Sequence, residues 1–108
     1  DNEKFLKEIG KRIIDRRKQE RLTQEELAEK IDVSPQIAEL GKKAIRPENL
    51  YKISMALGVS ADYILTGEII DKDIEYLQKK LQLLSSSKVR CIEDIIDSCI
   101  KLENNIKD

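Results

Sequence analysis

The 108-residue sequence contains no histidine, two cysteines, two prolines and four glycines, and only 4% of its residues are aromatic. A zinc site without histidine would need more thiolates than two cysteines supply, so we expect no metal. A glycine-rich phosphate loop and a paired carboxylate in a pocket-forming context are both missing, so we expect neither an enzyme nor a cofactor. The sequence has no apolar run near the 20 or so residues that span a bilayer and no signal peptide, so we expect a cytoplasmic protein without a membrane partner.

Charged residues make up 38% of the sequence and hydrophobic residues 40%, a balance that suits an all-α, soluble protein. The net charge of −1 argues against a non-specific polyanion binder, because such binding depends on basic surface. The charge is unevenly distributed, with 13 Lys and Arg against 12 Asp and Glu in residues 1–67, and 7 against 9 in residues 68–108. The slight positive excess therefore lies in the first part of the chain.

Residues 23–40 contain two short helical patterns joined by a few residues. Thr23 suits a helix N-cap, and Glu26 three positions later completes a capping box, so we expect a helix to begin at the next residue after Thr23. Asp32 tolerates the left-handed backbone that a sharp turn between helices requires. Pro35, which follows a serine suited to an N-cap, predicts the start of a second helix. The pattern predicts a helix-turn-helix.

Helical spacing also organises the rest of residues 1–67. Pro47 predicts the start of a helix that Gly58 ends, with Val59 as the hydrophobic contact that often accompanies such a cap. Ser60 then predicts the N-cap of a short helix over residues 61–65. The side chains expected on the inner faces are Phe5, Ile9, Ile13, Leu22, Leu50, Ile53, Leu57, Ile64 and Leu65. We therefore expect a five-helix domain that ends at residue 67.

In residues 68–108 the apolar residues form a narrow seam. They lie three and four residues apart on both sides of a break at Ser85–Ser87. This spacing predicts a two-helix hairpin. A lone hairpin cannot cover both of its apolar faces, so we expect it to form a homodimer; the alternative is that it packs on its own first domain. The expected dimerisation residues are Ile74, Leu77, Leu81, Leu84, Ile92, Ile95, Ile96, Cys99 and Leu102.

The two cysteines, Cys91 and Cys99, lie eight residues apart on the expected inner face of the second hairpin helix. That spacing separates them by about 12 Å along the axis, too far to form a disulfide with each other. We expect them to be reduced thiols in the core.

Five segments of the chain occur in an order and at separations that are typical of one protein family. They are residues 9–13 (IGKRI), Arg17, residues 22–28 (LTQEELA), residues 33–36 (VSPQ) and residues 56–60 (ALGVS). In these segments the chain resembles the phage repressor/Cro (XRE-type) DNA-binding family. The resemblance covers roughly Phe5 to Gly67 and implies a five-helix, repressor-like DNA-binding domain.

The resemblance also implies which residues contact a double-stranded DNA operator. The helix that begins at Pro35 would lie in the major groove, where Gln36 can bond an adenine edge and Glu39 can accept from a cytosine amine. The expected base-reading residues are Ser34, Gln36 and Glu39, and the expected phosphate-binding residues are Gln24, Lys42, Lys43, Arg46 and Asn49.

The chain departs from the family pattern inside this helix, with one residue fewer after Gln36 and two fewer after Leu40. Either the helix is shortened or residues are missing from the sequence at these points. The departure also removes the acidic ion-pair partner that the resemblance implies for Arg17. We expect a dimeric transcriptional regulator, a repressor that binds a pseudo-palindromic operator. The rival hypothesis is a helical protein-interaction module that has lost base reading and acts by binding another regulator.

Overall fold

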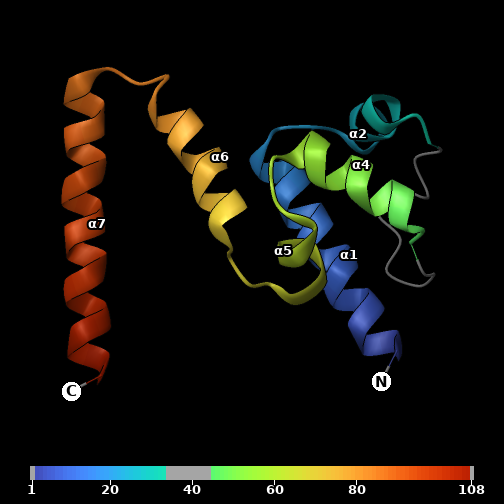
Figure 1. The fold of residues 1–108 in the computed structure, drawn as a ribbon, viewed down its shortest axis with the longest axis horizontal. Coiled ribbons are helices and arrows are strands. Elements are labelled where there is room, and N and C mark those ends of the chain that lie inside the picture. The colour runs from blue at the N-terminus through green and yellow to red at the C-terminus, as the bar shows by residue number, and fades with distance from the viewer. Residues whose placement is uncertain (1, 34–44, 108) are drawn as a thin grey trace. The chain divides into compact units, whose positions relative to one another are not determined.

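The structure, a computed structural model, describes residues 2–33 and 45–107. All of the regular elements in these residues are α-helices, which confirms the expected fold class (Figure 1). The helices are α1 (Asn2–Gln19), α2 (Gln24–Ile31), α4 (Pro47–Leu57), α5 (Ala61–Thr66), α6 (Asp71–Leu81) and α7 (Ser86–Lys107). The helix expected to begin at Pro35 lies outside the described residues.

The chain divides into two compact units, Asp1–Tyr76 and Leu77–Asp108. We call α1, α2, α4 and α5 of the first unit the head, and we call the second unit, which contains the end of α6 and all of α7, the arm. The boundary between the units lies inside α6, which runs through it without a break. The domain boundary expected at Gly67 stays a prediction.

The start and end of α2 are fixed by local hydrogen bonds, as the sequence predicts. The Thr23 hydroxyl accepts a hydrogen bond from the Glu26 N–H at 3.0 Å, and the Glu26 carboxylate accepts one from the Thr23 N–H at 2.9 Å. Asp32 ends the helix in the left-handed conformation, with φ 57° and ψ 50°, and its N–H donates to Ala28 and Glu29. The capping box and the sharp turn are both confirmed.

The caps of α4 and α5 are confirmed in the same way. Pro47 is the first residue of α4, and Gly58 ends that helix with φ 65°. The hydroxyl of Ser60 accepts the Tyr63 N–H at 3.0 Å and so caps α5. Gly67 ends α5 with φ 81°, a left-handed conformation that glycine adopts without steric cost.

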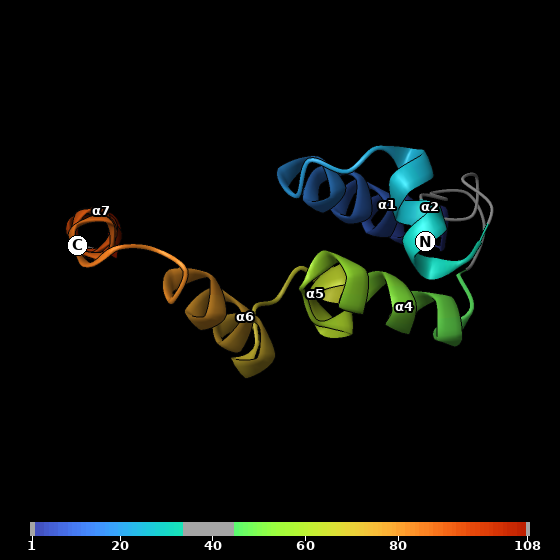
Figure 2. The same cartoon turned by 90° about the horizontal axis from the view of Figure 1, so that it is seen from above.

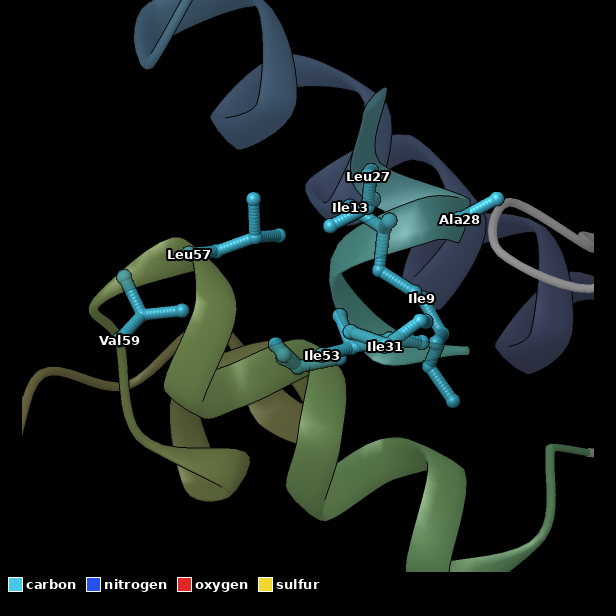
Figure 3. Close-up of a cluster of buried hydrophobic side chains, with 9 residues drawn as sticks. Ile9, Ile13, Leu27, Ala28, Ile31, Ile53, Leu57 and Val59 are labelled. Atoms are coloured by element: carbon cyan, nitrogen blue, oxygen red, sulfur yellow. The ribbon is translucent and has the colours of Figure 1, made fainter. Parts of the chain in front are cut away.

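The hydrophobic core lies between two layers of the head, with α1 and α2 on one side and α4 and α5 on the other (Figure 2). Most of its side chains point into this space in Figure 3. The buried residues are Ile9, Ile13, Leu27, Ala28, Ile31, Ile53, Leu57, Val59 and Ile64. Full burial of one such large side chain contributes about 1.5–3 kcal/mol. Phe5, expected on the inner face of α1, is instead 46% exposed.

Two arginines of α1 bind the carbonyl ends of the helices opposite. Arg12 donates from Nη1 to the carbonyls of Ile64 and Leu65 at 3.0 and 3.1 Å. Arg16 donates from Nε to the carbonyl of Leu57 at 3.1 Å. The last carbonyls of a helix have no partner within the helix, and a cation there also opposes the negative end of the helix dipole. The two guanidinium groups therefore tie α1 to the ends of α5 and α4.

The arm leaves most of its apolar side chains in contact with solvent. No residue of α7 is buried between Ser86 and Asn105, and Ile95 and Leu102 are 61% and 62% exposed. Cys91 and Cys99 are free and exposed, so the prediction that they are core thiols is wrong for this chain alone. Within the arm itself, the described part of that face of α7 is exposed.

Candidate nucleic-acid interface

The first candidate DNA contact, Gln24, is held by the capping box of α2. Gln24 is the first residue of the helix and is half-buried. The Thr23 N–H, which donates to the Glu26 carboxylate, and then the Thr23 hydroxyl hold the pKa of Glu26 below its usual range. The ionised Glu26 carboxylate is a strong acceptor for the Thr23 N–H, which stabilises the helix start at Gln24. A helix start held in this way is a suitable place for a phosphate contact.

The turn after α2 leads directly into the segment that carries most of the expected DNA contacts. Asp32 reverses the chain at the end of α2, and Val33 is half-buried against the core. Ser34, Gln36, Glu39, Lys42 and Lys43 follow, and all five lie outside the described residues. Their assignment to base reading or phosphate binding stays a prediction.

The chain returns to the described region at the start of α4. Arg46, the residue before the helix, has 81% of its side chain exposed, and its Nη1 lies 3.8 Å from a Glu48 carboxylate oxygen. An exposed pair at this distance is weak, so the guanidinium remains available to an anion. The N–H of Asn49 donates to the Arg46 carbonyl at 3.0 Å, so the side chain of Asn49, rather than its N–H, would contact a phosphate.

The arginines of α1 are used inside the head. Besides Arg12 and Arg16, Arg17 donates from Nη1 to the carbonyl of Leu22 at 2.6 Å. The acidic partner that the family resemblance implies for Arg17 would follow the reading helix, outside the described residues. All three guanidinium groups bind main-chain carbonyls, so the N–H donors that make these bonds are used within the head.

The expected dimerisation residues form a largely exposed surface. Leu81 and Ile92 are half-buried, and the others are exposed: Ile74, Leu77, Leu84, Ile95, Ile96, Cys99 and Leu102. The structure therefore presents these side chains to solvent, and their role in dimerisation stays a prediction.

The sequence reasoning missed one contact, between the starts of α5 and α6. The Asp73 carboxylate accepts hydrogen bonds from the N–H and the hydroxyl of Ser60, both at 2.8 Å, and from the Ile70 N–H at 2.9 Å. The sequence contains a signal for the bond to Ile70, because an acidic residue at the third position of a helix often accepts a hydrogen bond from the N–H of the residue before the helix. The bonds to Ser60 had none, since thirteen residues separate the two.

The described residues contain no group of three or more His, Cys, Asp and Glu side chains placed to hold a metal ion. None of the helices that the structure describes combines the length and apolar character required to cross a membrane.

A comparison with protein families matches residues 13–64 to the helix-turn-helix family. The match begins in α1, includes α2 and the turn at Asp32, and ends in α5 at Ile64. Comparisons with curated proteins and with solved structures give no match. The matched segment contains the capping box, the left-handed turn and most of the core described above. This similarity over residues 13–64 supports the XRE-type helix-turn-helix family of DNA-binding transcription regulators.

Proposed function

We propose that the chain is a repressor that binds a pseudo-palindromic operator as a homodimer, with the helix that begins at Pro35 in the major groove. The observation that carries the proposal is α2 with its left-handed turn at Asp32 inside a matched helix-turn-helix segment. In this motif the first helix crosses the DNA backbone and the second reads base edges. Gln36 would bond adenine, Glu39 would accept from cytosine, and Ser34 would lie at the start of the reading helix.

Phosphate binding would fix the register of each head on the duplex. Gln24 at the start of α2 and Arg46 with Asn49 at the start of α4 flank the reading helix in sequence, and Lys42 and Lys43 precede Arg46. Three cations in each of two heads would give a slope of log affinity against log salt of roughly −5.

The exposed seam of α7 supports pairing with a second copy. Ile92, Ile95, Cys99 and Leu102 recur at spacings of three and four residues, the pattern of helices that pack side by side. The charged residues Glu93, Asp94, Asp97 and Lys101 fall outside this seam. The apolar residues of α6 have the same three- and four-residue spacing, so two copies would contribute α6 as well as α7.

The position of α6 also favours a second copy over the chain's own head. Asp73, on the polar side of α6, contacts the head through Ser60. Ile74 and Leu77, on its apolar side, remain 55% and 49% exposed. The head thus binds the start of α6 through Asp73 and leaves Ile74 exposed. A dimer built on this seam would hold two reading heads for half-sites about one helical turn, near 34 Å, apart.

A selection from random DNA tests the function. The full-length protein is used to enrich duplexes from a random pool, and binding to the enriched duplex is then measured at several salt concentrations. We expect two inverted half-sites and affinity that falls steeply with salt. Enrichment of unrelated sequences, or binding that salt does not weaken, would contradict the proposal and favour the protein-interaction module, for which the exposed seam is the specific support.

Two substitutions separate base reading from phosphate binding. Gln36→Ala should relax the preference at one base position, with a change of about 1–3 kcal/mol in discrimination. Lys43→Ala should weaken binding to all sequences alike and reduce the salt slope by about 1 per head. The Lys43 variant serves as the control for the Gln36 variant, because a loss of fold would affect both properties in both proteins.

A further inference from the structure

The start of α6 is attached to the start of α5 by one carboxylate. Asp73 Oδ1 accepts the Ser60 N–H at 2.8 Å, and Oδ2 accepts the Ser60 hydroxyl at 2.8 Å and the Ile70 N–H at 2.9 Å. We call this set of three hydrogen bonds the Asp73 clamp. Hydrogen bonds to an ionised acceptor are shorter and stronger than neutral ones. The clamp therefore holds both sides of the short connection between α5 and α6.

Ser60, the residue that Asp73 binds, lies beside the hydrophobic core of the head. Ser60 is buried and follows Val59, a member of the core. Its hydroxyl also accepts the Tyr63 N–H at 3.0 Å, so one hydroxyl both caps α5 and binds Asp73. Because donor and acceptor capacity of the hydroxyl are both used, its orientation is fixed. Movement of the first turn of α6 would break these bonds together.

The charge on Asp73 is maintained by its surroundings. Partial burial alone would raise the pKa of Asp73. The hydrogen bonds from Ile70 and Ser60 outweigh that effect and, with the positive charge of Arg16 added, hold the pKa below its usual range. Three residues further along α6, Tyr76 donates to the sulfur of Met55 at 3.7 Å, a second and weaker contact with the head.

We propose that Asp73 is a positioning residue that makes operator binding sensitive to the spacing between half-sites. This inference rests on the proposed function, a dimeric operator-binding protein. The clamp holds the first turn of α6 on the head, and α6 then continues as one helix into the arm. Without the clamp, residues 67–70, which form no helix, become a flexible linker, and each head can turn independently of the pairing surface.

The substitutions that test the clamp are matched in charge and position. Asp73→Ala removes the acceptor, and Asp73→Asn keeps the size of the side chain but replaces one acceptor oxygen with a donor group. Asp71→Ala is the control, because Asp71 lies in the same first turn, carries the same charge and is exposed. Full-length proteins are used throughout, and Asp73→Asn replaces Asp73→Ala if the alanine variant does not fold.

Binding is measured on duplexes that carry the half-site selected by the unmodified protein. One duplex has two half-sites at the selected spacing, a second has one base pair inserted between them, and a third has a single half-site. Inserting one base pair rotates the half-sites by about 36°. We expect the insertion to weaken the unmodified protein and Asp71→Ala about tenfold, comparable to one mismatched position, and Asp73→Ala less than about threefold. Affinity for the single half-site should be equal in all three proteins.

A second measurement does not need DNA. Spin labels at the exposed positions Glu29 of α2 and Glu75 of α6, with both native cysteines changed to serine, report the distance distribution between the head and the start of α6. The distribution should broaden in Asp73→Ala and stay unchanged in Asp71→Ala. An unchanged distribution, an undiminished penalty for the inserted base pair, or a loss of single-site affinity would each overturn the positioning role. Failure of the unmodified protein to select paired half-sites would instead contradict the proposed function.

Discussion

The head and the arm differ in how far their apolar side chains are exposed to solvent. In the head, Ile13, Leu27 and Ile53 are fully buried between two layers of helices. In the arm, Ile95 and Leu102 have more than half of their surface exposed although they lie on an equally regular helical stripe. The helical pattern alone thus identifies an apolar face but does not say what covers it. The described helices of the head enclose a buried core, whereas the apolar stripe of the arm is exposed.

The largest expected effect is a cavity in the core of the head. Ile53→Ala should lower the free energy of unfolding by about 2–5 kcal/mol, because Ile53 is fully buried and its neighbours cannot fill the space. Urea unfolding of the full-length protein measures the change. Tyr51→Ala, on the exposed side of the same helix, is the control and should change stability by less than about 0.5 kcal/mol. Equal effects at the two positions would mean that the core is not closed as described.

The matching change in the arm should affect association. Ile95→Asp places a charge in the α7 seam and should raise the dimer dissociation constant about 100-fold, since an unpaired charge is costly to bury. Unfolding of the head should be unaffected. Sedimentation equilibrium measures the association, with Asn104→Asp as the control because it adds the same charge outside the seam. An Ile95→Asp protein that remains as dimeric as its control would show that the exposed seam is not the pairing surface.

The junction between the two regions offers a smaller effect at Gly67. Its φ of 81° is unfavourable for other residues, and a Cβ there would lie 3.2 Å from Nε of Arg12. Gly67→Ala should therefore lower stability by about 1–2 kcal/mol, measured by thermal unfolding. Gly67→Asn separates the two causes. Asparagine tolerates the left-handed conformation, so a smaller loss indicates backbone strain and an equal loss indicates displacement of Arg12 from its carbonyls.

The smallest expected effect is a dependence on pH at the junction. The folded-state pKa of Asp73 lies below its unfolded value of about 3.9, so the clamp adds stability above that pH and loses it as acid protonates the folded carboxylate. At pH 7 Asp73→Asn should be less stable than the unmodified protein by about 0.5–1 kcal/mol, because solvent reaches the half-buried carboxylate. The difference should shrink below about pH 4, as measured by urea unfolding at a series of pH values. A difference that stays constant down to pH 2.5 would contradict the hydrogen bonds described.

The features that the sequence predicted correctly are local ones. The capping box at Thr23 and Glu26, the turn at Asp32 and the end of α4 at Gly58 each depend on residues a few positions apart, and the structure confirms them. Spacing also identified most of the core, because a buried helical face has a fixed period.

The features that the sequence did not predict depend on residues far apart in the chain. Arg12 reaches carbonyls 52 and 53 positions away, and no local pattern distinguishes it from a solvated arginine. The exposure of Cys91 and Cys99 was missed because an apolar stripe has the same spacing whether its partner is in the same chain or outside it. The base-reading residues stay predictions, since all three lie outside the described residues.

The use of the α1 arginines inside the head bears on how such a regulator would search a genome. Contacts with phosphates hold a protein on DNA of any sequence, and the number of such contacts sets how long it slides before it dissociates. The guanidinium groups of Arg12 and Arg16 bind carbonyls at helix ends instead, and that of Arg17 binds the carbonyl of Leu22. In the proposed operator-binding protein, fewer phosphate contacts would shorten the time spent on non-cognate DNA and leave specificity to the base edges that it reads.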